Sequence, residues 1–306
     1  MGFLPIDETV RLQRLVPPTG RVSMVLDTDT ANEIDDQFAV AYALLAPDRL
    51  DVEALYAAPF SNSRSIGPED GMERSYDEIL RVLDRMGHAS DELVLKGARS
   101  YLPAADEPVP SPAADDLVER AMVPREGPLY VLAVGAITNV ASALLMAPEI
   151  IERIVVVWLG GQPHSWHTAL EFNLRQDMHA ARVILDSGVP FVQIPCKNVS
   201  EHLTTTRAEL EAHIAGRNAL CDYLYEIFCG YSDNHFAWGK VIWDISAVAW
   251  VLDASWVPSV LTHSPLLTDR GTWSHDRTRH LVREAIHCNR NAIFGDLFRR
   301  LAEAPE

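Results

Sequence analysis

Short apolar runs alternate with amphipathic stretches along most of the chain. Each run has the length of a strand and is followed by polar residues, then by apolar residues at helical spacing. The clearest case follows the run at 22–26, where the spacing predicts a helix from about Glu33. Its apolar positions are Ile34, Phe38, Tyr42 and Leu45. Further strands are predicted at 52–58, 129–134, 154–159 and 191–194.

This alternation of strands and helices predicts an α/β fold with a mainly parallel, doubly wound sheet. No internal repeat, low-complexity tract or long linker divides the sequence. We therefore expect a single domain over residues 1–306, in which residues 1–20 form an N-terminal extension. Ligands bind at the carboxyl ends of the strands in such folds, so we expect the active site there.

The net charge of the chain indicates which classes of binding partner to expect. With 43 acidic and 26 basic side chains among 306 residues, the formal net charge is −17. Such a surface repels phosphates, so a nucleic-acid partner is not expected, whereas cations and small molecules are favoured. The four cysteines lack the C-x-x-C spacing of a zinc site, and no disulfide framework is expected.

Two features bear on localisation. No apolar run approaches the ~18 residues that span a bilayer, so no membrane partner is expected. Asp7 and Glu8 stand where a secretory signal would be apolar, which favours a cytoplasmic protein.

Acidic residues are concentrated directly after the first predicted strand. Asp27 and Asp29 end the strand, and Glu33, Asp35 and Asp36 follow within ten residues. A helix N-terminus capped by Asn32 would explain the last three, but it leaves the two strand-end aspartates unexplained. Carboxylate oxygens are the ligands of hard divalent cations, so we predict metal binding or catalysis at this segment.

This segment resembles the opening motif of the inosine–uridine-preferring nucleoside hydrolases. In that family a strand ends in Asp-x-Asp, and an Asp-Asp pair opens the next helix. Four further motifs follow in the family's order, so that the resemblance covers residues 22 to about 250. They are Ser61-Asn62, the segment 134–139, Leu159-Gly160-Gly161 with Glu171-Phe172-Asn173, and Trp243-Asp244, where the family carries His-Asp.

The resemblance implies an activity and its cofactor. It implies calcium-dependent hydrolysis of the N-glycosidic bond of a ribonucleoside, releasing free base and ribose, as in purine or pyrimidine salvage. The implied partner is a small-molecule ribonucleoside. The implied assembly is a homodimer or homotetramer.

The resemblance also implies roles for the metal ligands and the catalytic residues. Asp29 would bind Ca²⁺ and accept the proton of the attacking water, and Asp35 would bind the ribose 2′-hydroxyl. The further calcium ligands would be the carboxylates of Asp36 and Asp244 and the backbone carbonyl of Thr138. Asp27 would lie behind the ligands, as a less direct partner.

The remaining matched residues would bind the sugar. By resemblance, Asn173 would hold the 2′/3′ edge of the ribose, Glu171 would face its 5′-hydroxyl, and Asn62 would also contact substrate. Structural alternatives stay open: Asn62 is a common turn residue, Glu171 and Asn173 can be satisfied by backbone, and Thr138 and Asp244 can cap helices.

The sequence departs from the family pattern at positions that bear on substrate choice. The turn between Asp29 and Asp35 is two residues longer, and Trp243 replaces a His that can protonate a purine. We expect Trp243 and Trp166 to line the base pocket and stack on the base. The alternative proton source is a histidine, with His164, His167 and His235 as candidates.

Two other functions compete with this interpretation. Haloacid-dehalogenase-like phosphatases also place Asp-x-Asp-x-Thr after the first strand, with Asp27 as nucleophile, Asp29 as acid/base and Mg²⁺ as metal. The changes around the base could instead indicate a calcium-dependent nucleoside- or ribose-binding protein without turnover.

Overall fold

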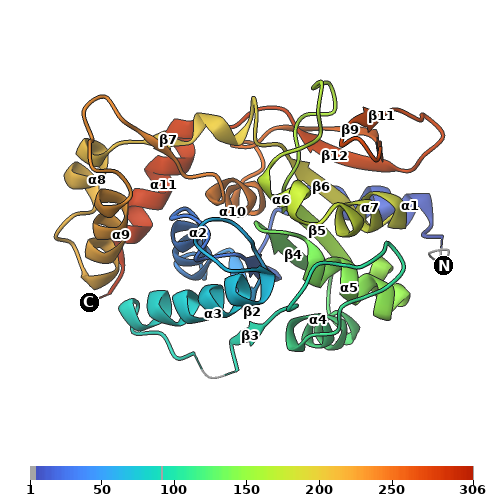
Figure 1. Cartoon of the computed structure of the whole chain (residues 1–306), viewed down its shortest axis with the longest axis horizontal. Coiled ribbons are helices and arrows are strands. Elements are labelled where there is room, and N and C mark those ends of the chain that lie inside the picture. The colour runs from blue at the N-terminus through green and yellow to red at the C-terminus, as the bar shows by residue number, and fades with distance from the viewer. Residues whose placement is uncertain (1–4, 91, 306) are drawn as a thin grey trace.

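The structure, a computed structural model, describes residues 5–90 and 92–305. Its centre is an eight-stranded sheet with the order β3-β2-β1-β4-β5-β6-β12-β9 (Figure 1). Neighbouring strands are parallel except for β12 and β9. The strands of this sheet are β1 (Val22–Thr28), β2 (Leu50–Ala57), β3 (Val94–Lys96), β4 (Leu129–Ala133), β5 (Ile154–Leu159), β6 (Phe191–Ile194), β9 (Ser259–His263) and β12 (Leu281–Ala285).

Helices cover both faces of the sheet (Figure 1). Successive side chains of β1 point to opposite faces: Leu26 packs in the core that includes helices α2, α3, α9, α10 and α11, and Val25 in the core that includes α4, α5 and α7. The helices are α1 (Glu8–Arg14), α2 (Asp36–Leu44), α3 (Pro68–Arg85), α4 (Pro112–Met122), α5 (Thr138–Met146), α6 (Phe172–Gln176), α7 (Met178–Ser187), α8 (Arg207–His213), α9 (Ala219–Gly230), α10 (Ile245–Leu252) and α11 (Arg290–Glu303).

Short elements connect these layers. Two antiparallel strand pairs lie outside the main sheet, and two 3₁₀ helices complete the chain. They are β7 (Thr204–Thr205) with β8 (Lys240–Val241), β10 (Leu266–Leu267) with β11 (Trp273–Ser274), η1 (Pro148–Glu152) and η2 (Ser200–His202).

The expected single-domain α/β fold with a mainly parallel sheet is confirmed. The five predicted strands all form, each with its bounds within two residues of the prediction. The helix after β1, which is α2, was predicted to start at about Glu33. It begins at Asp36. The backbone N–H of Asn32 donates to the carbonyl of Asp29, which closes a turn before the helix starts. The N-cap position is therefore held by Asp35, not by Asn32.

The described part of the N-terminal extension packs against the domain. Leu15 is fully buried in the core, and the Arg11 guanidinium donates to the backbone carbonyl of Gly188 over 3.1 Å. Among the described residues, no helix combines the length and apolarity that a bilayer crossing requires.

Candidate active site

A cavity of about 310 Å³ lies at the carboxyl ends of β1, β4, β5 and β6. The loops after these four strands and the segment before α10 supply its wall. Seven predicted site residues line it: Asp29, Asp35, Asp36, Glu171, Asn173, Trp243 and Asp244. The rule that ligands bind at this edge of a parallel sheet therefore located the cavity correctly.

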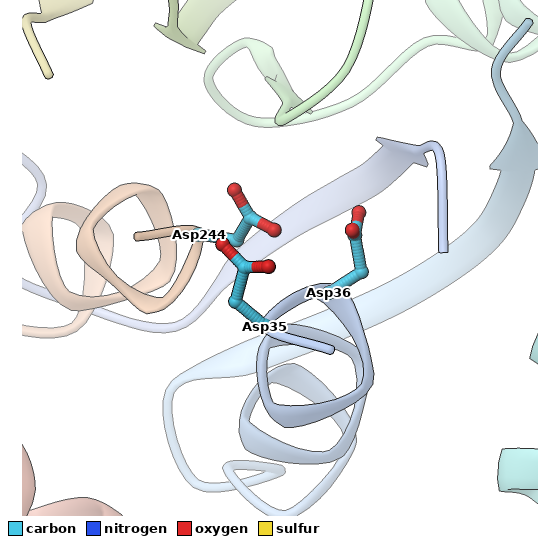
Figure 2. Close-up of side chains that lie close together, drawn as sticks. All are labelled: Asp35, Asp36 and Asp244. Atoms are coloured by element: carbon cyan, nitrogen blue, oxygen red, sulfur yellow. The ribbon is translucent and has the colours of Figure 1, made fainter. Parts of the chain in front are cut away.

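Three of these carboxylates converge from two separate elements. Asp35 and Asp36 stand at the start of α2, and Asp244 immediately precedes α10 (Figure 2). One oxygen of each lies within 4.8 Å of the others, close enough to hold one ion. All three side chains are buried, as is that of Asp29.

Neither Asp35 nor Asp244 caps its helix with its side chain. Each occupies an N-cap position, yet neither side chain accepts a hydrogen bond from the first turn. Asp35 Oδ2 accepts the backbone N–H of Trp243 over 3.2 Å, which ties the two helix starts together. The carboxylates therefore face the cavity, and capping does not account for them.

The electrostatics of this cluster favour a bound cation. Burial, followed by repulsion from neighbouring carboxylates, raises the pKa of Asp36 to about 8 and the pKa values of Asp29 and Asp244 well above their ordinary value. The buried Oδ2 of Asp29 has no hydrogen-bond partner among the described residues. A hard divalent ion would supply the missing charge and take oxygen ligands of this kind, so the residues fit the predicted metal.

A lysine that the sequence analysis did not consider borders the cluster. Lys240 Nζ pairs with Glu33 Oε2 and lies 3.8 Å from Asp35 Oδ1. Burial alone would lower the pKa of Lys240, but Asp35 and Glu33 raise it above its ordinary value. Lys240 therefore carries a buried positive charge on one flank of the carboxylates.

Glu171 and Asn173 form another part of the cavity wall. The Glu171 carboxylate accepts backbone N–H groups from Gly161, Asn173 and Leu174. The Asn173 Nδ2 group donates to the carbonyls of Val134, at 2.9 Å, and Leu159, at 3.0 Å. Backbone groups thus satisfy much of the hydrogen-bonding capacity of both side chains. The Asn173 Oδ1 atom accepts no hydrogen bond from the described residues.

Thr138, the predicted carbonyl ligand, lies outside the cavity, as does Asp27, which was predicted to lie behind the ligands. Thr138 is buried, and its hydroxyl donates to Asp177 Oδ2 over 2.8 Å. Val134, four residues earlier in the same segment, lines the cavity instead. Asp27 is buried behind the cavity, where its Oδ1 accepts from Asn139 Nδ2 over 2.7 Å and burial raises its pKa to about 7.

Two predicted substrate contacts also lie outside the cavity wall. Asn62 forms a turn with the backbone N–H of Arg64, and its Nδ2 donates to Asn32 Oδ1 over 2.6 Å. It therefore braces the wall and does not line it. The Trp166 ring packs beside the His167 ring, away from the cavity.

The three candidate histidines do not line the cavity either. His164 is buried behind the wall, where its Nε2 bonds to Gln193 Oε1 and burial lowers its pKa. His235 packs among Phe228 and Trp238.

Three cavity residues belong to no motif of the sequence analysis: Gln162, Cys196 and Lys197. The wall also includes Asn32, Glu33 and Phe172, which lie within predicted motifs but had no predicted site role. Cys196 and Lys197 directly follow β6, so the strand-end rule could have identified them. Asn32 and Glu33 belong to the lengthened turn after Asp29.

Together, the fold and the cavity define an α/β enzyme whose buried carboxylates are arranged to hold a cation and a small polar substrate. The chain belongs to the inosine-uridine preferring nucleoside hydrolase family, whose model matches residues 24–293. Enzymes of this family hydrolyse N-glycosyl bonds, and the expected family and enzyme class are thereby confirmed.

Named relatives agree with this membership. The chain is 26% identical over 272 residues to a protein from Arabidopsis thaliana named probable uridine nucleosidase 2, covering 80% of each chain. It is 26% identical over 258 residues to the pyrimidine-specific ribonucleoside hydrolase RihA of Escherichia coli, covering 75% of this chain and 79% of that one.

Solved structures share the fold. The plant nucleoside hydrolase PpNRh1 superposes with a TM-score of 0.74 at 21% identity, covering 94% of this chain and 100% of the other. An inosine-guanosine nucleoside hydrolase has the same TM-score at 18% identity and the same coverage of both chains.

Proposed function

We propose that the protein hydrolyses the N-glycosidic bond of a ribonucleoside in a calcium-dependent reaction and releases free base and ribose. The observation that carries the proposal is that the buried carboxylates of Asp29, Asp35, Asp36 and Asp244 line one cavity. The charge of Lys240, which is already paired with Glu33, does not neutralise four carboxylates. Four buried carboxylates are therefore costly in such a place, and a bound divalent ion offsets that cost.

The calcium ion would be held by oxygen ligands from three loops. The Asp29, Asp36 and Asp244 carboxylates are the charged ligands. The Val134 carbonyl replaces that of Thr138 in this proposal, because Val134 lines the cavity and Thr138 does not. When bound, the ion lowers the pKa of water and orients the hydroxyls of the sugar.

Each of four residues then has a separate role at the sugar and the attacking water. The unpartnered Asp29 Oδ2 accepts the proton of the attacking water. Asp35 accepts a ribose hydroxyl proton in a hydrogen bond, and Asn173 Oδ1 faces the same edge of the sugar. Glu171, anchored by three backbone N–H groups, marks the far end of the ribose site.

The departing base has no histidine acid beside it among the residues described. We therefore assign the base side to the Trp243 ring, which lines the cavity and can stack on a planar heterocycle. The names of the curated relatives make uridine the first substrate to test.

The competing phosphatase function is not favoured by the geometry. Its nucleophile would be Asp27, whose carboxylate is buried against Asn139 and does not line the cavity. A nucleophile has to reach the substrate, and this one does not.

A nucleoside panel tests the proposal. Uridine, cytidine, inosine, adenosine and guanosine are incubated with the protein and calcium, and free ribose is measured. We expect ribose release from at least one of them and no phosphate release from p-nitrophenyl phosphate with magnesium. Calcium-dependent binding of nucleosides without ribose release would identify a binding protein instead.

A further inference from the structure

The lengthened turn after Asp29 places the carboxylate of a glutamate, Glu33, on the cavity wall. Glu33 lies in this turn, outside the carboxylate cluster, and 36% of its side chain is exposed. The hydrolytic steps proposed above leave it without a task.

A buried lysine holds the Glu33 carboxylate in place. Lys240 Nζ pairs with Glu33 Oε2, donates to the Val241 carbonyl over 3.0 Å and lies 5.3 Å from the centre of the Tyr231 ring. Only 9% of the Lys240 side chain is exposed, so it has little freedom to move. Within the residues described, Glu33 Oε1 makes no hydrogen bond and is available to a ligand.

The turn that carries Glu33 is itself braced. Asn32 Oδ1 accepts from Asn62 Nδ2 over 2.6 Å, and the Asn32 N–H donates to the Asp29 carbonyl over 2.7 Å. A side chain fixed at both its tip and its backbone loses little conformational entropy when a ligand binds, which favours a role in recognition.

The position of Glu33 relative to Trp243 indicates which part of the substrate it meets. Lys240, the partner of Glu33, and Trp243 are three residues apart on the segment from β8 to α10. Glu33 and Trp243 line the same cavity, so a base that stacks on Trp243 while its ribose lies on the carboxylate cluster can turn the edge remote from the sugar toward Glu33.

We propose that Glu33 selects bases that present a ring N–H donor on the edge remote from the glycosidic bond. The inference rests on the proposed function. An ionised carboxylate only accepts hydrogen bonds, so a base without such a donor would bury the Oε1 atom unpaired. Uracil at N3 and hypoxanthine at N1 carry this donor. The paired Lys240 charge offsets the repulsion between the carboxylate and a base that leaves with its electron pair.

Uridine and 3-methyluridine test the inference, because the methyl group removes the N3–H donor. We expect Glu33→Ala to lower kcat/KM for uridine about 10- to 100-fold, the effect of losing one hydrogen bond to a charged group. The same variant leaves kcat/KM for 3-methyluridine unchanged or raises it. Glu33→Gln keeps the size of the side chain and one acceptor, and gives a smaller loss with uridine.

The controls separate the possible failures. Glu226→Gln, on the exposed side of α9, should behave as wild type with both substrates. Should Glu33→Ala fail to fold, the ratio of the two substrates in Glu33→Gln decides the question. Unchanged uridine kinetics in folded Glu33 variants, or equal losses with both substrates, would overturn the inference while the proposed function stands. If wild type releases ribose only from purine nucleosides, inosine and 1-methylinosine provide the same comparison. If it releases none from any nucleoside, the proposed function itself fails.

Discussion

Asp29 illustrates how the environment of one residue can favour catalysis. Burial and three neighbouring aspartates raise its pKa, and its Oδ2 atom has no partner among the described residues. A cation bound to one oxygen would stabilise the ionised form of such a carboxylate, and the other oxygen would be free to accept a proton from water.

Replacing Asp29 by Asn tests this division of labour. Asn keeps the shape and removes both the charge and the basic oxygen, so we expect kcat to fall about 10²–10⁴-fold. The Km of the substrate should change far less, because the ribose is held mainly by other residues. Steady-state kinetics of Asp29→Asn, with exposed Asp115→Asn as the matched control, measure both effects. Near-normal turnover in Asp29→Asn would contradict the proposed mechanism.

At the scale of elements, the loop from β4 to α5 fixes Asp29 from behind. Gly135 lies in this loop, and a Cβ atom there would stand 3.0 Å from Asp29 Cγ and 3.1 Å from Asp29 Cβ. No real side chain fits this space without moving the aspartate. Close packing against Asp29 therefore explains why the motif at 134–139 contains a glycine at position 135.

We expect Gly135→Ala to displace Asp29 and lower kcat about 10- to 100-fold, since small misplacements of a reacting group are costly. Gly295→Ala on α11 is the control, because its Cβ would meet nothing within 4 Å. It should leave the rate unchanged and stabilise the helix by up to ~1 kcal/mol. Equal activity of Gly135→Ala and wild type would show that the position of Asp29 does not depend on this loop.

The sequence predicts strands better than it predicts turns. The run 154–159 is apolar throughout because β5 is buried on both faces, and its bounds are those predicted. The short strands β9 and β12 were not predicted, because half-exposed residues interrupt their apolar pattern. The start of α2 was misplaced because Ile34 is buried, as a helical position would be, although it belongs to the turn.

In the candidate site, too, residues at strand ends and helix starts were easier to predict than residues in loops. Residues fixed by strand ends and helix starts, such as Asp29 and Asp244, were predicted to share a site and lie in one cavity. The carbonyl ligand could not be located within 134–139, since any backbone oxygen of a loop can face a cavity. Trp166 does not line the cavity. Its position could not be predicted, because the path of the loop after β5 depends on tertiary contacts, among them the bond from the Ala169 N–H to the Gly271 carbonyl.

At the scale of the molecule, the carboxylate cluster joins elements that are distant in sequence. Asp36 begins α2 and Asp244 precedes α10, so a shared ion would cross-link two helices about 200 residues apart. Ligand binding to the native state alone raises stability by mass action.

Calcium should therefore raise the melting temperature. At 100 times its dissociation constant, the expected gain is about 2.7 kcal/mol. Differential scanning calorimetry with calcium or with a chelator measures the gain, and Asp244→Asn should abolish most of it. The proposed site would be contradicted by a wild-type melting temperature that ignores saturating calcium.

His280 makes a contribution of its own to the dependence of stability on pH. Burial, followed by the charges of Arg11, Arg279 and His263, lowers the pKa of His280 to about 4. Between pH 6.5 and 4 the unfolded chain binds a proton on this imidazole and the native chain does not, so the contribution of His280 to stability declines as the pH falls through this window.

Replacing His280 by Gln should flatten that decline by up to ~1.4 kcal/mol per pH unit. Urea unfolding at pH 7, 6, 5 and 4 measures the change, and His88→Gln, at an exposed position, is the control. An unaltered slope in His280→Gln would mean that this imidazole does not titrate differently in the two states.

We propose that the enzyme hydrolyses a ribonucleoside only when a calcium ion is bound to Asp29, Asp36 and Asp244. The most direct test follows ribose release from the best nucleoside of the panel while calcium is added back to chelator-treated enzyme. We predict a rate near background in chelator and a saturable rise to full activity as calcium fills the site. Full ribose release in excess chelator would contradict the account.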